Sequence, residues 1–560
     1  MRGWTLGFVG LGPLLVSGAC GSPAADDAND DVVIDGARAL DAAVLDGGVT
    51  PDGDPDGTWR SALYPADWTP AFTAPDGGFL HDFSYAGYHR SEVALPAAWP
   101  GDSFDVTTYG AVAAPADSTA AFVAAIAAAQ AAGGGVVYVP DGEYRLFGNL
   151  VVTASNVVIA GQSRDGTKLT FTDSNLNGNA NITFAGGTPG NAPAAPLTID
   201  GVARSFTIAV ADASGFAIGD DVVIDQVITQ AFIDEHAMDG LWDTGGNSAL
   251  GDRKIFYRRQ IVGIANGVIT LDVPLRYPLK LRDTPTVRLD LGLLRECGLE
   301  HLSLNNAVDL LDANAAPRAH AVRLAHVSDC VVRDVATYDS SYAPTTDHLQ
   351  SGGIEIVASK RVTVADSRMT HAQNHGDGGA GYGYEVSTSS DVLFRDDYVE
   401  DVRHGFIQNW DFGTTGVVWL RCEAVDDTAV NSGFTVPGRS EFHHRLAIAN
   451  LFDASRDTAG YASYNRGDDS SNAGHAGSEN VFWNVAGDGD GTRMSIYQVG
   501  RGYVIGTRDV TAMVEPDILD QLQGYADGTG PVDWLEGDGQ GATLWPPSLF
   551  EDQLAKRLGR

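Results

Sequence analysis

Gly353-Ile-Glu-Ile, Gly383-Tyr-Glu-Val, Gly405-Phe-Ile-Gln, Gly433-Phe-Thr-Val and Gly460-Tyr-Ala-Ser-Tyr repeat one short phrase in this chain of 560 residues. The phrase returns every 22 to 30 residues, a period that indicates a solenoid. Second apolar runs follow the phrases, as in Arg361-Val-Thr-Val, with turns rich in Asp, Asn and Gly between the runs. The pattern predicts an all-β fold, a right-handed single-stranded parallel β-helix whose coils stack about 4.8 Å apart.

Composition divides the rest of the chain into segments. Residues 1–20 carry a lone Arg2, an apolar stretch and small residues before Cys20. This predicts a secretion signal, with Cys20 as the lipid-bearing residue of a bacterial lipoprotein or, alternatively, plain secretion. Residues 21–75 are rich in Asp, Gly, Ala and Pro, which predicts a disordered tether. We therefore expect an exported protein of the cell envelope, held at a membrane only through a lipid anchor.

The folded body follows the tether. Residues 76–101 are interpreted as a lead-in segment and residues 102–510 as the β-helix. An insertion of antiparallel strands is expected at about 197–285, with Asn266-Gly267 as a hairpin turn. Residues 511–560 are interpreted as a covering segment that ends in an amphipathic helix over the last coil.

The start of the body carries a resemblance to a known family. Its motifs are Tyr109-Gly110-Ala111, the run from Gly133 to Val137, and Pro140-Asp-Gly-Glu-Tyr144. In these residues the chain resembles the pectate-lyase-like superfamily of right-handed parallel β-helix proteins. The resemblance implies that this segment forms an N-terminal capping helix and the first coils, and it implies little about chemistry.

Charge and cysteine content exclude several classes of function. The formal net charge is −37, so nucleic acid is not expected as a partner. A polyanionic glycan would bind only through a local groove of Arg and His or through a bridging cation. Beyond Cys20, only Cys297, Cys330 and Cys422 remain, which is too few for a disulfide framework or a zinc ribbon.

Histidines gather in the last coils. Six of the 13 fall between His371 and His475. Aligning the Gly-initiated phrases places their turns along one edge of the solenoid, where we expect a groove. The residues predicted to be catalytic are Arg403, His404, His444, Arg466 and His475. The residues predicted to bind substrate are His375, Gln408, Arg445, Asn465 and Trp483.

These positions also carry a second resemblance, to an uncharacterised subgroup of pectate-lyase-superfamily proteins. The matching motifs are Arg403-His404, His444-Arg445, Asn465-Arg-Gly467 and Gly474-His475, while Ala476 departs from the expected Gly. A lyase that cuts a uronic acid polymer must neutralise the substrate carboxylate, remove the adjacent proton and protonate the leaving oxygen. Arg suits the first task, and His suits the proton transfers.

A pair of carboxylates offers a rival site. Glu355 and Glu385 occupy the same position of successive phrases, so their backbones should stack. Unbridged, they would repel each other, and one pKa should rise. The pair could serve a glycoside hydrolase, hold a calcium ion together with Asp377, or form a solvated outer ladder.

The sequence therefore predicts an enzyme that degrades an extracellular polysaccharide, with a lyase mechanism favoured over hydrolysis. A non-catalytic glycan-binding or adhesive β-helix is the third hypothesis, since long stacked surfaces bind chains without chemistry. A polysaccharide is the expected partner. A trimer is compatible with the resemblance, although no feature of the sequence indicates one.

Overall fold

The computed structural model describes residues 54–560 except 174, 177, 188–191, 245–252, 377, 378, 432, 433, 490 and 517–529. Cys20, Asp377 and most of the predicted tether lie outside the described residues. Residues 57–560 form one structural unit, apart from residues 1–56. Within the described part, no helix is long and apolar enough to cross a bilayer.

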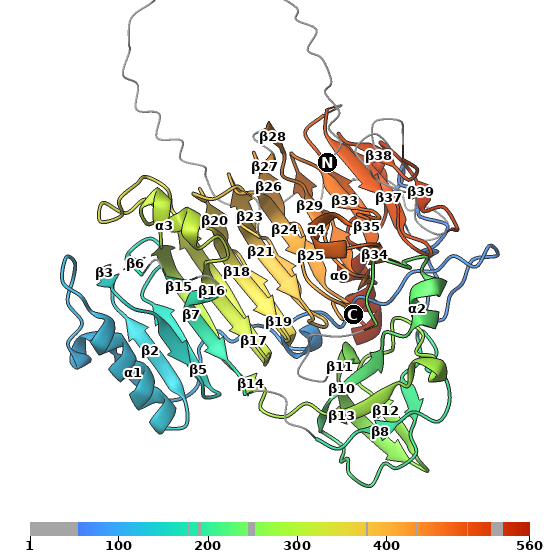
Figure 1. Cartoon of the computed structure of the whole chain (residues 1–560), viewed down its shortest axis with the longest axis horizontal. Helices are drawn as coiled ribbons and strands as arrows, with labels where there is room; N and C mark the ends of the chain where they lie inside the picture. Colours follow the sequence, from blue (N-terminus) through green and yellow to red (C-terminus); the bar gives the residue numbers. More distant parts are fainter. Residues whose placement is uncertain are drawn as a thin grey trace, which may run out of the picture. The chain divides into compact units, whose positions relative to one another are not determined.

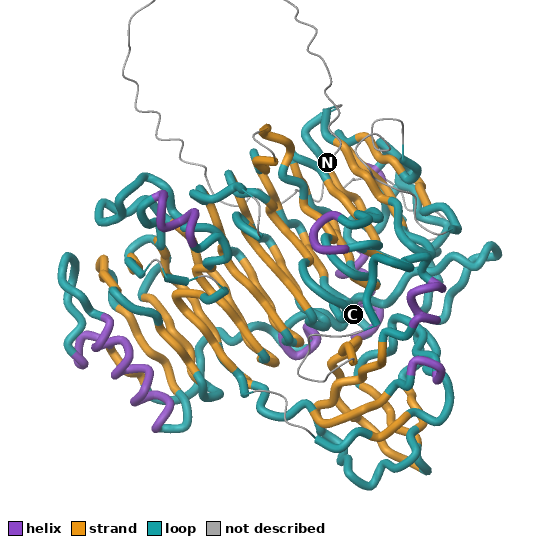
Figure 2. The backbone as a smooth tube through the Cα atoms, in the orientation of Figure 1, coloured by secondary structure: helices purple, strands orange, loops and turns teal. Residues whose placement is uncertain are grey.

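Parallel strands stacked in coil order form the body of the molecule (Figures 1 and 2). One sheet has ten strands, one from each coil, and each strand pairs with the strand of the next coil. In spatial order they are β4 (Leu150–Val152), β7 (Ala180–Ala185), β16 (His320–Ala325), β18 (Gly352–Val357), β21 (Tyr382–Ser387), β24 (His404–Gln408), β29 (Ser440–Phe442), β33 (Tyr461–Ser463), β36 (Arg493–Ile496) and β38 (Thr511–Met513).

The other faces of the coils belong to a 19-stranded sheet. Its strands are β1 (Ser103–Asp105), β2 (Gly135–Val139), β3 (Gly142–Leu146), β5 (Val157–Gly161), β6 (Thr167–Phe171), β14 (Leu294–Arg295), β15 (Gly298–Asn305), β17 (Val327–Thr337), β19 (Lys360–Ala365), β20 (Arg368–Thr370), β22 (Leu393–Arg395), β23 (Tyr398–Glu400), β25 (Val418–Leu420), β26 (Glu423–Val425), β31 (Leu451–Asp453), β32 (Arg456–Asp457), β35 (Val481–Ala486), β37 (Tyr503–Arg508) and β39 (Trp534–Glu536). The short strands β30 (Ala447–Ile448) and β34 (Gly477–Ser478) pair in parallel beside it. This arrangement confirms the predicted parallel β-helix.

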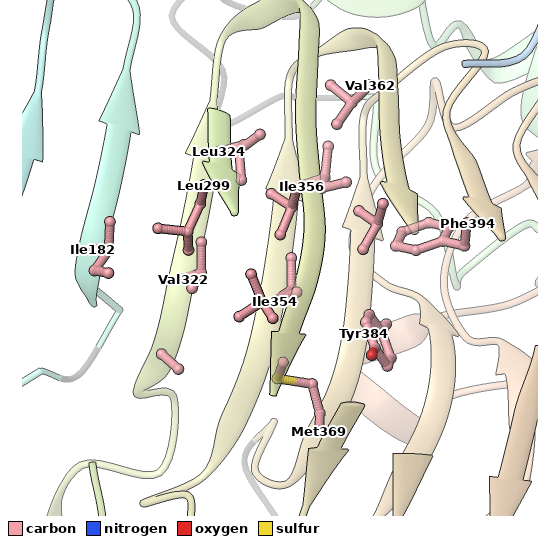
Figure 3. Packing of buried hydrophobic residues seen from close by; sticks show 14 of the residues in the cluster. Ile182, Leu299, Val322, Leu324, Ile354, Ile356, Val362, Met369, Tyr384 and Phe394 are labelled. Atoms are coloured by element: carbon pink, nitrogen blue, oxygen red, sulfur yellow. The ribbon is translucent and has the colours of Figure 1, made fainter. Parts of the chain in front are cut away.

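Side chains of equal register fill the interior in columns (Figure 3). Val322, Ile354 and Tyr384 are aligned on β16, β18 and β21 and are fully buried. An aromatic column continues the core, with the rings of Trp419 and Phe452 stacked 4.5 Å apart. Columns of this kind bury large apolar surfaces in every coil, which is the main source of the stability of a solenoid.

The glycines of the repeated phrase allow close packing. A Cβ on Gly383 would lie 2.4 Å from Cγ2 of Val399, and a Cβ on Gly353 would lie 2.7 Å from Cγ of Met369. Both neighbours belong to the core. Any larger residue would therefore push the strand away from the interior.

The predicted register is confirmed for four of the five phrases, those of Gly353, Gly383, Gly405 and Gly460, and wrong for one. Gly383 and Gly405 lie in adjacent coils, because Tyr382 pairs with His404 and Tyr384 with Phe406. The phrase that begins at Gly433 does not supply the next rung. Its strand β28 (Phe434–Pro437) pairs antiparallel with β27 (Thr428–Asn431), and the next rung is β29. A hairpin inserted between two coils had the same apolar pattern as a coil strand.

The antiparallel insertion is confirmed. Its six strands are, in spatial order, β8 (Ala195–Pro196), β13 (Thr286–Leu289), β10 (Asp221–Val227), β11 (Arg253–Ala265), β12 (Val268–Leu271) and β9 (Thr207–Ala209). The insertion leaves the solenoid after β7 but packs against much later coils. The buried guanidinium groups of Arg259 and Arg276 each lie 3.0 Å from a carboxylate oxygen of Asp391. A buried charge needs such partners, so these ion pairs fix the insertion to the β-helix.

Two of the expected boundaries are wrong. Residues 57–75 are not part of a tether, because Leu63 and Tyr64 are fully buried and the Tyr64 hydroxyl donates to Asp552 at 2.6 Å. The solenoid also continues past residue 510, since Trp534 on β39 pairs with Tyr503 on β37. A few aromatic residues inside a polar segment were enough to bind it to the folded body.

The helices of the described residues are short. They are α1 (Thr119–Ala131), α2 (Gln230–Glu235), α3 (Leu310–Ala315), α4 (Asp469–Asn472) and α6 (Leu549–Leu558), with 3₁₀ turns η1 (Tyr88–Ser91), η2 (Val106–Tyr109), η3 (Leu281–Asp283) and η4 (Gly541–Thr543). The helix α1 packs on β1 and β2, the first coils, as expected for a cap (Figure 1). The terminal helix α6 was expected over the last coil. It lies instead along the side of the solenoid, where Leu549 and Phe550 pack with Leu420 and Leu451.

Candidate active site

Neighbouring strands of the ten-stranded sheet bring two histidines to one glutamate. His404 begins β24, Glu441 lies on β29 and His443 follows it. The Nε2 atom of His404 lies 3.6 Å from Oε1 of Glu441. The Nδ1 atom of His443 contacts the same oxygen. We call these three residues the His404 cluster.

The tautomer of His404 follows from its surroundings. Its Nδ1 lies 2.8 Å from the carbonyl oxygen of Arg439. A carbonyl oxygen only accepts, so Nδ1 carries the proton and Nε2 keeps its lone pair. Burial lowers the pKa of His404 to about 3, with the positive charge of Arg403 adding to the effect and Glu441 opposing it. The imidazole is therefore neutral at neutral pH and has one nitrogen that can accept a proton.

Glu441 stays ionised in this buried place. Burial by itself would raise its pKa, but His443, Arg466 and His404 hold it well below the usual range. Arg466 donates from Nη1 to Oε2 of Glu441 at 3.2 Å and from Nη2 to the hydroxyl of Ser470 at the same distance. A buried carboxylate with these donors is a fixed negative charge.

Tyr382 adds a hydroxyl group beside the cluster. It lies opposite His404 in the register of β21 and β24, and the two ring centres are 5.5 Å apart. Its hydroxyl has no hydrogen bond to any described residue. Burial raises its pKa to about 12, so the phenol keeps its proton. The guanidinium of Arg403 lies 5.9 Å from the centre of the Tyr382 ring and donates to the carbonyl of Gly376 at 2.7 Å.

Glu385 and Glu355 form a second polar group two and three rungs earlier than Glu441. Oε2 of Glu385 lies 2.9 Å from Nε2 of His320, and its Oε1 accepts from Arg318 at 3.2 Å and from Asn409 at 2.8 Å. Glu355 lies 2.9 Å from the Nε of Arg323. The expected rise in pKa is wrong for Glu385. Burial raises its pKa, but His320 and Arg318 lower it to about 2.

Both polar groups could be considered as cation sites. His404, Glu441 and His443 each offer one donor atom within 4.8 Å of the others, as do His320, Glu355 and Glu385. In both sets an arginine already binds the carboxylate. Calcium prefers six to eight oxygen ligands, which these sets do not supply. The arrangement thus fits ion pairing better than the expected calcium site, and Asp377 lies outside the described residues.

Four of the ten residues predicted to be catalytic or to bind substrate lie in or beside the His404 cluster: Arg403, His404, His444 and Arg466. The ring of His444 stacks on Trp410 at 4.8 Å and lies 5.2 Å from the ring of His443. Three successive rungs supply these four residues, but from opposite ends of the strands. Arg403 and His404 lie at the start of β24, whereas His444 follows β29 and Arg466 follows β33, so their turns do not share the single edge that the sequence predicted.

Three other predicted residues have structural positions. Gln408 is fully buried and accepts the backbone N–H of His443 at 3.2 Å, so it is not open to substrate. Trp483 is fully buried under the C-terminal segment and donates to the carbonyl of Pro546 at 3.0 Å. His475 is 1% exposed and lies against Met238 of the insertion. These contacts are structural, and the predicted roles of the three residues stay predictions.

The remaining three hold turns. Both ring nitrogens of His375 face carbonyl oxygens, of Thr428 at 2.9 Å and of Ala372 at 2.8 Å. The side chain of Asn465 accepts the N–H of Gly467 at 3.0 Å, and Arg445 donates to the carbonyl of Ser471 at 3.2 Å. These contacts are typical of polar residues that close loops.

Sequence reasoning missed Tyr382, Glu441, Arg318 and His320 as members of the site. Tyr382 immediately precedes the Gly383 phrase, just as His404 precedes the Gly405 phrase. The position before each glycine was therefore the signal that could have found it.

One family model and several solved structures are similar to this chain. The family model described as rhamnogalacturonase A/epimerase, pectate lyase-like, matches residues 103–227, the first coils and part of the insertion. No curated protein sequence matches the chain. The chain is similar to ORF18 of Geobacillus virus E2 at 11% identity, over 78% of this chain and 61% of that one, with a TM-score of 0.38. It thus spans less than two thirds of that protein.

Two further solved structures are similar to this chain. The Gp54 tailspike of Acinetobacter baumannii bacteriophage AP22, solved with an A. baumannii capsular saccharide, is similar at 10% identity over 78% of this chain and 67% of that one, with a TM-score of 0.41. The A-module of the mannuronan C-5 epimerase AlgE4 of Azotobacter vinelandii is similar at 12% identity over 78% and 95%, with a TM-score of 0.29. At these identities the likeness concerns the fold alone.

Proposed function

We propose that this protein cleaves a uronic-acid-containing polysaccharide by β-elimination at the His404 cluster. One observation carries the proposal. A neutral imidazole, fixed by Arg439 so that Nε2 can accept a proton, lies beside a phenol whose hydroxyl has no hydrogen bond to any described residue. Nε2 of the imidazole can accept a proton and the phenol can donate one, which are the two proton transfers that β-elimination requires.

The reaction divides among the residues as follows. The guanidinium groups of Arg466 and Arg403 offset the charge of the substrate carboxylate, which makes the adjacent C–H acidic. Nε2 of His404 accepts that proton as the C–H bond breaks. The electron pair forms a C=C bond and expels the glycosidic oxygen, which takes a proton from Tyr382.

Glu441 has a supporting part. Its ionised carboxylate lies 3.6 Å from Nε2 of His404, so it would stabilise the imidazolium that forms when the proton is taken. Arg403 and Arg466 against one carboxylate, Glu441, leave the site with a local positive charge, although the chain as a whole has a net charge of −37.

The hydrolase alternative has less support. A glycosidase needs one carboxyl group that stays protonated at the working pH. Glu385 has its pKa lowered to about 2 and is bonded to Arg318, His320 and Asn409, so it would not donate a proton.

A panel of polysaccharides tests the proposal. Polygalacturonate, alginate and hyaluronan, with dextran as a neutral control, are incubated with the full chain. Elimination produces an unsaturated uronate that absorbs in the ultraviolet, together with new reducing ends. Reducing ends without absorbance would support hydrolysis instead, and saturable binding without either product would support the non-catalytic glycan-binding solenoid.

Export and lipid attachment at Cys20 complete the proposal, supported by the small residues that precede it. Labelled fatty acid should join the wild-type chain in bacterial cells, and Cys20→Ala should release the protein from the membrane fraction. Wild-type protein without label would favour plain secretion.

A further inference from the structure

Trp410 stands out beside the His404 cluster because it is exposed. Its exposed fraction is 43%, whereas that of His444, on which it stacks at 4.8 Å, is 4%. The guanidinium of Arg318, whose side chain is 21% exposed, lies 5.4 Å from the centre of the indole ring. Both partners are more deeply buried than the ring that covers them. The indole therefore keeps a large apolar area open to solvent at the edge of the site.

The backbone holds this ring in an unfavourable conformation. Trp410 has φ 50° and Asp411 has φ 47°, both in the left-handed region that residues with large side chains rarely adopt. Positive φ at residues other than glycine recurs in many turns of this structure, so at Trp410 it shows only that the surroundings hold the loop in one conformation.

The antiparallel insertion holds the residues that follow Trp410. Lys254 on β11 forms an ion pair with Asp411. The ring of Phe412 packs among the insertion's aromatic residues, 5.7 Å from Phe256 and 5.1 Å from Trp242. Gly413 approaches the carbonyl of Ile255 so closely that a Cβ would lie 2.1 Å from its oxygen. Asp411, Phe412 and Gly413 are thus anchored to the insertion, while Trp410, just before them, has an exposed ring.

The loop is also continuous with the cluster. Asn409 donates to Glu385 at 2.8 Å, and the rings of His404 and His443 are 5.7 Å apart, with those of His443 and His444 5.2 Å apart. A row of rings therefore runs from His404 to Trp410. Trp410 is the exposed end of this row, since His404, His443 and His444 are each at most 7% exposed.

We propose that the Trp410 indole is a binding platform for one pyranose ring of the polysaccharide, next to the sugar at which the His404 cluster acts. This subsite rests on the proposed function for the class of its ligand. A pyranose ring has a face of C–H groups with partial positive charge, which packs on the negative face of an aromatic ring. The ring needs no movement to do so, since its backbone is already fixed.

The test compares Trp410→Ala with Trp410→Phe, which keeps an aromatic face. Phe147→Ala is the matched control, because Phe147 is 50% exposed and also has an arginine, Arg145, 4.8 Å from its ring centre. The substrate is the polyuronate of the panel that the wild type cleaves. With it, Trp410→Ala should raise KM about tenfold, with a much smaller change in kcat. Trp410→Phe should restore most of the loss, and Phe147→Ala should match the wild type.

Native gel electrophoresis with the panel polysaccharides embedded in the gel separates failure of the subsite from failure of the proposed function. If the wild type cleaves none of the polysaccharides but Trp410→Ala is retarded less than the wild type, the subsite is retained and the proposed elimination is refuted. Unchanged KM and retardation would overturn the subsite, as would absence of retardation of the wild type by any glycan. A fall in kcat that follows a lower melting temperature would also overturn it, since Trp410 would then only shield His444.

Discussion

Replacing Tyr382 by phenylalanine removes a single oxygen atom from the proposed site. The Tyr382 hydroxyl bonds to no described residue, so its loss breaks no hydrogen bond within the described part of the chain. The ring itself remains against His404, at 5.5 Å between centres. We therefore expect the free energy of unfolding to change by less than about 0.5 kcal/mol, because no buried group is left unpaired.

The effect on turnover should be much larger. Loss of a general acid typically lowers the rate by about 100-fold to 10,000-fold. Since the pKa of Tyr382 is raised to about 12 and that of His404 is lowered to about 3, both groups keep their working protonation states across neutral pH. The variant should thus be slower at every pH from about 5 to 9, without a change in the shape of the profile.

Tyr384→Phe is the matched control on the same strand. Tyr384 is fully buried in the core, and its hydroxyl donates to the carbonyl of Tyr398 at 3.2 Å. This variant should lose about 1 kcal/mol of stability and keep its turnover per folded molecule. Initial rates and melting temperatures are measured on the same preparations. Full turnover in Tyr382→Phe, or losses in both variants that follow the melting temperature, would refute the assignment of Tyr382 as the acid.

Two further predictions concern stability. Burial lowers the pKa of His475 to about 4, with the charge of His236 adding to it, so the folded protein binds fewer protons than the unfolded chain between about pH 4 and 6.5. The stability contributed by neutral His475 is complete above that window and lost as the pH falls. His475→Leu should therefore reduce the fall of the unfolding free energy with decreasing pH by up to about 1.4 kcal/mol per pH unit and leave turnover intact. Melting temperatures that fall in parallel for both proteins from pH 7 to 4.5 would contradict this. Gly383→Ala should destabilise by about 1 to 3 kcal/mol because its Cβ would lie 2.4 Å from Val399, whereas Gly215→Ala, with nothing within 4 Å, should have little effect in chemical denaturation.

Local pattern was enough to predict the solenoid and part of its register. In a parallel stack, residues at the same place in successive repeats become neighbours, so Glu355 and Glu385 could be paired from spacing alone. The same reasoning predicted that Arg403, His404 and His444 would share one edge, whereas the structure has the first two at the start of β24 and His444 after the end of β29. It also failed at Gly433, because an antiparallel hairpin and a coil strand show the same alternation of apolar residues over four positions.

Other features depend on contacts between residues far apart in the chain, which only the tertiary structure decides. His475 lies beside arginine and histidine motifs in the sequence, yet the insertion, which leaves the solenoid more than 200 residues earlier, covers it. Tyr64 binds to Asp552 across almost the whole chain. The protonation state of each site residue also depends on contacts between residues far apart in the chain. Sequence supplies the imidazole of His404, but the carbonyl of Arg439, the burial and the neighbouring charges decide which nitrogen carries its proton and whether it is charged.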